Sequence, residues 1–414
     1  MSDPLAAGIH ALAVPGLADG FAAALGAHRF LHNDRVTLPR LSEPLHHVAR
    51  QWRQQTPDAW GLVVHDWSTL HYPGHVRKTD QTRLSHRKDR GYELTNLLLV
   101  DGRNGDPVAP LELRLRAALK VYSTREPTPN RKAYRIDEVL PSMQAVANLG
   151  LGGPLVHVID READVLAQYR DWQASGQHFL VRAKGSRKVR WRGQELSLSD
   201  LAGQLPLRRC REVTYRGQSA VQRVAEAEVV LDRPAWRHRR RGGRLINERV
   251  PGPPITLRLV VSRVCDASGQ TLAVWYLLTN LPCEVATATV ALWYYWRWRI
   301  ESLFKLLKSA GHQIEHWQQE GGEAIAKRLL VAAMACVLVW RVERASSAEA
   351  GTLRSLLVRL SGRQLEWGRK HTAPALLAGM WVLLSMLAVL EEHSVEELRR
   401  FKKLILDTAD EDTG

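Results

Sequence analysis

The sequence predicts an α/β protein with a mixed sheet, a β-rich insertion and helical regions at both ends of the chain. Apolar strand-like segments alternate with helical segments between about residues 60 and 184. Strand-like segments then fill residues 185–283, and helical periodicity returns from about residue 286. With 414 residues and 45% hydrophobic composition, the chain is long enough for two or three domains with buried cores.

The first region, residues 1–59, is predicted to be a helical N-terminal domain. Its apolar segments are short, and turn residues at Pro15, Pro39 and Pro44 separate them. Arginines are scattered along the same region. This pattern indicates a small domain of short helices that carries positive charge.

The second region, residues 60–320, contains the predicted sheet. The turn at 101–107 joins two strand-like segments and predicts a hairpin. Helices are predicted at about 136–149 and 161–172. The predicted strands are 61–66, 91–100, 110–119, 154–160 and 178–184. Strands and helices in this order are expected of an α/β sheet with a mixed strand arrangement.

The third region, residues 321–414, is predicted to be helical and to end in an acidic tail. Its most apolar stretch, 374–390, is slightly short for a bilayer span and has charged residues on both sides. We therefore expect a buried helix and no membrane partner.

The charge balance points to a polyanionic partner. The chain has 58 Lys+Arg against 43 Asp+Glu, a formal net charge of +15, which favours nucleic acid first and an anionic membrane second. The four cysteines show neither a CxxC pair nor metal-ligand spacing, so unpaired thiols in a reducing compartment are expected and zinc is not. The first residues lack the features of a secretory signal, which favours a cytoplasmic protein.

A helix predicted at about 286–309 carries an unusual polar stripe. At 100° per residue its members fall within a sector of about 80° that runs about 21 Å along the axis. They are Tyr294, Arg297, Glu301, Lys305 and Lys308. Apolar residues occupy the other side of the helix, so the stripe is not needed for packing. It is either a phosphate-binding surface that contains an acid, or a solvated face with i,i+4 ion pairs.

Two aspartates give the acid of this stripe possible partners. Asp66 and Asp160 each end an apolar predicted strand, and neighbouring strands would bring both to one sheet edge, where the helix could deliver Glu301. Three carboxylates suit Mg²⁺, and a pair of such ions would support phosphoryl transfer on a nucleic acid. The alternative is that both aspartates are ordinary strand-end or helix-capping residues.

The two motifs together resemble the bacterial insertion-sequence transposases of family four. The pattern Tyr294-x2-Arg297-x3-Glu301-x6-Lys308 matches the Y-R-E-K signature of that family, and residues 160–164 match its DREAD segment. Over residues 60–320 the resemblance implies an RNase H-like core. It also implies a DDE triad of Asp66, Asp160 and Glu301 that binds two Mg²⁺ ions, with Mn²⁺ as a possible substitute. Asp66 departs from the family pattern because Trp67 follows it where small hydroxyl residues are common.

The resemblance also implies DNA contacts. Arg297, Lys305 and Lys308 would contact phosphates, and Tyr294 would position a terminal strand. In relatives that cut through a hairpin intermediate, a tryptophan in a segment like the one around Trp275 holds a flipped base. A core tryptophan on a strand is the alternative for that residue.

Two basic segments are further candidates for DNA contact. Arg182 and Lys184 begin a basic ribbon after the predicted strand that follows Asp160. A second group is predicted on a loop of the insertion, suited to backbone contact without base readout, and comprises Arg237, Arg239, Arg240 and Arg241. A solvated flexible loop is the competing interpretation of that group.

These expectations combine into a cut-and-paste DNA transposase, nucleoid-associated, that acts on the ends of its own element. The N-terminal domain would recognise the terminal inverted repeats, and the helical region 321–414 would pair two protomers into a homodimer. The alternatives are a structure-specific nuclease without strand transfer and a DNA-binding regulator without catalytic activity.

Overall fold

The computed structural model describes residues 20–402 except for 87, 132, 134, 242, 243, 309, 366, 367 and 369. The beginning of the predicted N-terminal domain, 1–19, and the acidic tail, 403–414, lie outside the described residues. The chain divides into two compact units: one combines residues 1–44, 75–79 and 305–414, and the other combines 45–74 and 80–304. The units interleave segments from both ends of the chain rather than following one another in sequence.

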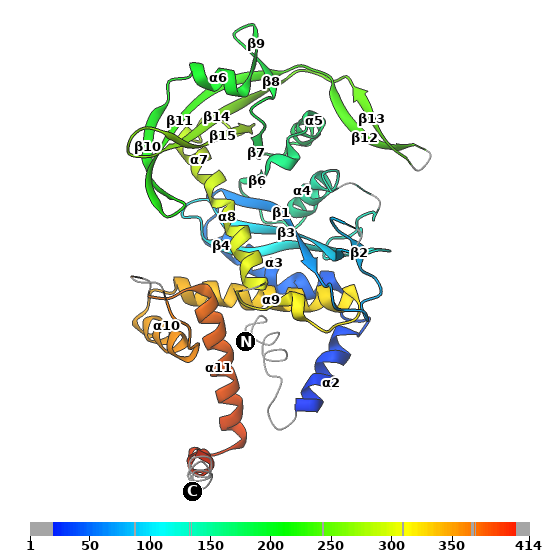
Figure 1. Ribbon diagram of the computed structural model, residues 1–414, viewed down its shortest axis with the longest axis vertical. Helices are drawn as coiled ribbons and strands as arrows, with labels where there is room; N and C mark the ends of the chain where they lie inside the picture. The colour runs from blue at the N-terminus through cyan, green and yellow to red at the C-terminus, as the bar shows by residue number, and fades with distance from the viewer. Residues whose placement is uncertain are drawn as a thin grey trace. The chain divides into compact units, whose positions relative to one another are not determined.

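The larger unit is built on one mixed sheet, as the sequence predicts (Figure 1). The strand order is β5-β4-β3-β1-β6-β7-β15-β14-β11-β8-β9, with β2 paired to β3 and β10 paired to β11. The bounds are β1 Gly61–His71, β2 Thr82–Arg83, β3 Arg90–Asp101, β4 Pro107–Arg116, β5 Val121–Ser123, β6 Leu155–Ile159, β7 Phe179–Ala183, β8 Lys188–Trp191, β9 Gln194–Ser197, β10 Arg208–Tyr215, β11 Gln218–Leu231, β14 Ile255–Cys265 and β15 Thr271–Thr279.

The centre of the sheet contains both pairing types. β1 runs parallel to β6, which runs parallel to β7, whereas β3 is antiparallel to β1 and β15 is antiparallel to β7. The strands of the insertion thus extend the same sheet through β15. Only β12 (Ala235–Arg241) and β13 (Arg244–Val250) form a separate two-stranded hairpin within the described residues.

Helices α4 (Val139–Ala147) and α5 (Leu166–Ala174) close an apolar core with the strands of this unit. Trp172 and Phe179 are fully buried there, and their rings pack edge to face with centroids 5.5 Å apart. The predicted helix 161–172 is two segments, because the short 3-10 helix η1 (Arg161–Ala163) ends before α5 begins. A further helix, α6, spans Leu198–Gln204.

The helix predicted at 286–309 is also divided. α7 (Thr287–Trp296) and α8 (Trp298–Leu307) meet at Arg297. There the Arg297 N–H donates to the Tyr294 carbonyl and the Ile300 N–H donates to the Arg297 carbonyl. These i to i+3 hydrogen bonds tighten the turn locally, while the backbone of Arg297 stays in the helical region with φ −50° and ψ −32°. α8 and α3 (Leu38–Gln55) each run from one unit into the other.

The smaller unit is helical in its described part. Its helices are α2 (Gly20–Leu31), α9 (Gly322–Arg344), α10 (Ala348–Leu360) and α11 (Ala373–Glu392), with a short 3-10 helix, η2, at Ile314–His316. α9 is its main buried helix.

The apolar segment 374–390 forms α11, but the prediction of a buried helix is only half right. Leu376 and Leu377 near its start are buried, whereas Val382, Met386, Leu387 and Leu390 are 39% to 49% exposed. Among the described helices, α11 is the one long and apolar enough to cross a membrane, and 22% of its apolar window is buried.

Candidate active site

The sheet places the two predicted aspartates side by side. The parallel pairing of β1 with β6 ends at His65 and Ile159, so Asp66 and Asp160 are the next residue of each strand on the same face. The prediction that Asp66 ends its strand is wrong. β1 continues to His71 because its antiparallel pairing with β3 extends to Gly91.

Asp160 occupies the N-cap position of η1, yet its side chain makes no capping hydrogen bond there. The Asp160 side chain therefore does not form the helix-capping hydrogen bond of the alternative interpretation. The Tyr294 hydroxyl instead donates to Asp160 Oδ1 over 2.9 Å.

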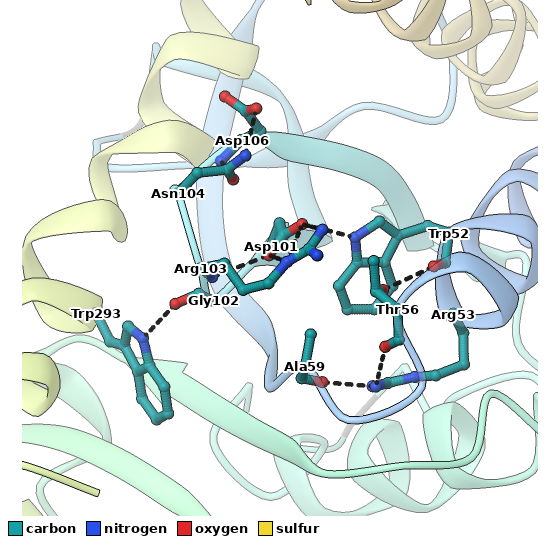
Figure 2. Close-up of polar contacts among 10 residues, drawn as sticks. All are labelled: Trp52, Arg53, Thr56, Ala59, Asp101, Gly102, Arg103, Asn104, Asp106 and Trp293. Atoms are coloured by element: carbon teal, nitrogen blue, oxygen red, sulfur yellow. Dashed lines mark hydrogen bonds and ion pairs between the residues drawn. The ribbon is translucent and has the colours of Figure 1, made fainter.

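Helix α7 is held against the sheet by its tryptophans. The Trp293 indole Nε1 donates to the Gly102 carbonyl over 2.9 Å, in the turn between β3 and β4 (Figure 2). Asp101 secures that turn, because it accepts hydrogen bonds from the Trp52 indole and the Arg103 guanidinium. Tyr294, the next residue, thereby enters the site from a fixed helix.

The close approach of α7 to this turn requires a glycine at position 105. Gly105 has φ +77°, and a Cβ built there would lie 2.5 Å from the Trp296 ring. Only glycine allows both this backbone conformation and the close approach of the indole.

Arg297 joins two of the three acids. Its Nη1 contacts Asp66 Oδ2 over 2.8 Å and its Nη2 contacts Glu301 Oε1 over 2.6 Å. The Arg297 side chain is 7% exposed, so this is a buried cation between two carboxylates rather than a solvated stripe residue. The planar guanidinium suits this role because its donors point to two acceptors at once.

The acids differ in proton affinity. Burial raises the pKa of Asp66 from 3.8 to about 6; Arg297 and the Trp67 N–H oppose this shift, while the charges of Glu301 and Asp160 add to it. Burial also acts to raise the pKa of Asp160, but the Arg161 N–H, the Arg297 charge and the Tyr294 hydroxyl outweigh it, and the pKa is lowered. Asp66 is thus close enough to Glu301 and Asp160 to be affected by both of their charges.

Aromatic and basic residues border the acids. Arg182 Nη1 lies 3.9 Å from Asp160 Oδ1. Trp275, on β15, has its ring centroid 6.3 Å from that of Tyr294. Trp275 is partly buried, and its role in holding a flipped base stays a prediction.

The three carboxylates are suitable ligands for a divalent cation, but in this structure they are not arranged to bind one together. Carboxylate oxygens such as those of Asp66 and its neighbours Glu301 and Asp160 are the ligands that Mg²⁺ prefers. Among the described residues, however, no three His, Cys, Asp or Glu side chains converge as a metal-binding group. The Arg297 guanidinium lies where Asp66 and Glu301 would share a cation.

The other predicted DNA contacts are divided between the two units. Lys305 and Lys308 belong to the smaller unit, where Lys308 Nζ lies 3.4 Å from Glu315 Oε1. The Lys184 side chain is exposed just beyond β7. The predicted basic loop is in fact strand β12, because its backbone pairs with β13. The side chains of Arg237, Arg239, Arg240 and Arg241 lie outside the described residues.

The sequence reasoning missed three supporting residues. Glu162, in the DREAD segment, accepts a hydrogen bond from the Trp67 indole over 3.1 Å, which gives the unusual Trp67 a partner. Asp164 is buried and accepts from the Tyr169 hydroxyl and the Lys184 N–H, so it joins η1 to α5 and β7. Asn96 lies opposite Asp66 in the β1–β3 register. The DREAD motif itself signalled the first two, and the strand pairing signals the third.

The sequence also matches the model of a known protein family. The family described as the transposase DDE domain matches residues 62–338. This span includes Asp66, Asp160 and Glu301 and covers more than half of the chain.

Proposed function

We propose that this chain, which belongs to the transposase DDE domain family and is thus a transposase, uses Asp66, Asp160 and Glu301 to cut the ends of its own element and to join the freed 3′ hydroxyls to target DNA. The observation that carries the proposal is the grouping of these three acids around Arg297. A protein that only bound DNA would gain nothing from carboxylates in a phosphate-binding groove.

The proposed core is RNase H-like, and its acids would hold two Mg²⁺ ions, with Mn²⁺ as a possible substitute. Such ions, when bound, activate the attacking water or 3′ hydroxyl and stabilise the leaving oxygen of the phosphodiester. Asp66 and Glu301 are expected to release Arg297 when they take up this role, which leaves the guanidinium free to contact the scissile phosphate.

The DNA path is proposed from the residues around the acids. Tyr294 and Arg182 already contact Asp160, and Trp275 adds an aromatic surface for the flipped base of a hairpin intermediate. Lys184, Lys305 and Lys308 are proposed phosphate contacts. The roles of Tyr294 and Lys308 follow from the resemblance to the family-four signature.

The basic ribbon supports an extension of this path. Arg187 is bound to Asp164, whereas Lys188 is exposed. A pocket beside the β12–β13 hairpin is lined by Lys188, Arg233 and Arg249 together with Trp236, whose side chain is 61% exposed. Cations and an open indole together suit contact with a DNA strand, and the basic run of β12 continues from this place in the sequence.

The ends of the chain are proposed to organise the complex. The N-terminal region would read the terminal inverted repeats, and the exposed apolar residues of α11 support pairing of two protomers. The +15 net charge supports a nucleoid-associated cytoplasmic protein.

Labelled element ends incubated with the protein and Mg²⁺ test the proposal. Nicked ends together with strand-joined products are expected; nicks without joined products would indicate the nuclease instead. DNA-end binding without either product would leave the regulator as the function.

The matched variant is Glu301→Gln, which keeps the size of the side chain but removes its charge. Cleavage is expected to fall by at least 100-fold while end binding, measured by gel shift, changes less than threefold. Cleavage that survives while binding is lost would contradict the role of Glu301.

A further inference from the structure

Asn96, on β3, is buried without a hydrogen-bond partner. Its side chain is 0% exposed, and neither Oδ1 nor Nδ2 has a partner among the described residues. A buried amide normally satisfies at least one of these atoms, because an unmet donor or acceptor destabilises the fold. Such an exception calls for a reason.

The strand register places Asn96 beside one polar group. Asn96 pairs directly with Asp66, so both side chains project from the same face of the sheet. Directly paired residues have Cβ atoms about 4.5–5.5 Å apart, which is within reach of an amide and a carboxylate. The flanking residues Leu94 and Leu98 on this face and the β4 partner Leu113 are buried and apolar.

Asp66 already has other partners in this arrangement. Its Oδ2 contacts Arg297 and its Oδ1 accepts from the Trp67 N–H. While Arg297 holds the carboxylate, Asn96 is left without a partner. In this arrangement Arg297 occupies the position beside Asp66 that a metal cation would take, and the Asn96 amide has no partner among the described residues.

We propose that Asn96 is a positioning residue for Asp66: when Asp66 exchanges Arg297 for a divalent cation, Asn96 Nδ2 donates to the carboxylate and orients it. This inference rests on the proposed metal-dependent function. Groups that hydrogen-bond a ligating carboxylate typically change metal affinity by 10- to 100-fold when they are removed.

Mn²⁺ binding to the full chain, measured by calorimetry, and thermal unfolding without metal test the proposal together. Asn96→Leu removes both unmet polar atoms at similar size. Its Mn²⁺ affinity is expected to fall 10- to 100-fold while its metal-free Tm stays equal or rises by a few degrees. A purely structural asparagine would give a lower Tm and an unchanged affinity, which would overturn the proposal.

Ser142→Ala is the matched control. Ser142, on α4, is also fully buried, and its hydroxyl also has no partner among the described residues. Its replacement is expected to leave Mn²⁺ affinity unchanged. Equal losses of affinity in Ser142→Ala and Asn96→Leu would assign the effect to general repacking and overturn the proposal.

Asn96→Thr and Asn96→Val provide a second comparison in case leucine disturbs the fold. The two side chains have nearly the same shape, but only threonine keeps a donor. The threonine variant is expected to bind Mn²⁺ at least threefold more tightly; equal affinities would refute the role of Asn96. A wild-type chain that binds no Mn²⁺ would refute the proposed function as well, whereas wild-type binding with unaffected variants would refute only the role of Asn96.

Discussion

At the scale of single residues, the site is organised by Arg297. The sequence spacing suggested a stripe of DNA contacts facing solvent, but Tyr294 and Arg297 are 3% and 6% exposed and their polar groups contact the acids. Burying a carboxylate such as Asp66 is costly unless a cation and hydrogen bonds compensate it. Arg297 supplies that compensation for Asp66, and it also pairs with the more exposed Glu301.

The pKa of Asp66 predicts a pH effect on stability. The folded chain holds this proton more tightly than an unfolded chain, because the pKa is about 6 rather than 3.8. The ionised form therefore costs stability, and the cost develops as the pH rises from about 4 to about 6. The Asp66→Asn variant has no carboxyl group at this position and therefore does not titrate there. Relative to wild type, its free energy of unfolding is expected to improve by about 1–3 kcal/mol between pH 4 and pH 7.

Thermal unfolding of both proteins across this range, without added metal, measures the effect. Asp58→Asn, which replaces an exposed aspartate of the same unit, serves as the control. Parallel pH curves for Asp66→Asn and wild type would show that Asp66 does not titrate as described.

At the scale of elements, the close fit between the β3–β4 turn and α7 positions the site. Trp293 bonds to Gly102, and Trp296 packs where Gly105 has no side chain. The sequence indicated a hairpin and a helix here. It could not indicate their contact, because the two segments are almost two hundred residues apart.

Gly105→Ala tests this contact. A methyl group would meet the Trp296 ring at 2.5 Å and would also sit at a positive φ. Gly193→Ala isolates the second effect, since Gly193 has φ +80° and nothing within 4 Å of its built Cβ. Gly193→Ala is expected to cost about 1–2 kcal/mol of unfolding free energy, and Gly105→Ala an additional ~1–3 kcal/mol for overpacking. If urea unfolding gives equal losses of unfolding free energy for the two variants, the Trp296 ring moves aside at no energetic cost.

At the scale of the whole molecule, the described helices of the smaller unit leave an apolar surface uncovered. Met386, Leu387 and Leu390 of α11 are 47%, 49% and 45% exposed, and Val395 and Phe401 beyond the helix are similarly open. Exposed apolar residues grouped in this way commonly mark an interface. This is the observation behind the proposed homodimer.

Met386→Glu with Leu390→Glu is expected to keep the chain monomeric. Two charges on the uncovered half of α11 would oppose an apolar interface without disturbing the buried first half. Light scattering of the DNA-bound protein measures the change: wild type is expected to hold two element ends and the variant one. Glu392→Gln, at the exposed end of the same helix, is the control, and pairing that survives in the double variant would exclude this surface as the interface.

The transposase assignment and the mixed α/β sheet were both predictable from the sequence and are confirmed. Strand and helix periodicities are local properties, and the Y-R-E-K and DREAD motifs pointed to a transposase because each is a short run of fixed spacing. The breaks at Arg297 and after η1 were not predictable, because they depend on hydrogen bonds and packing that act across elements.

Only the tertiary structure decided which side chains meet. The sequence by itself determined the mixed α/β class, the transposase class and the chemical character of the candidate acids. It could not determine that Arg297 lies between Asp66 and Glu301, that Trp67 bonds to Glu162, or that Asn96 faces Asp66 without a partner. These contacts arise from strand register and helix packing, which bring distant segments together and set the burial that gives each polar group its energy.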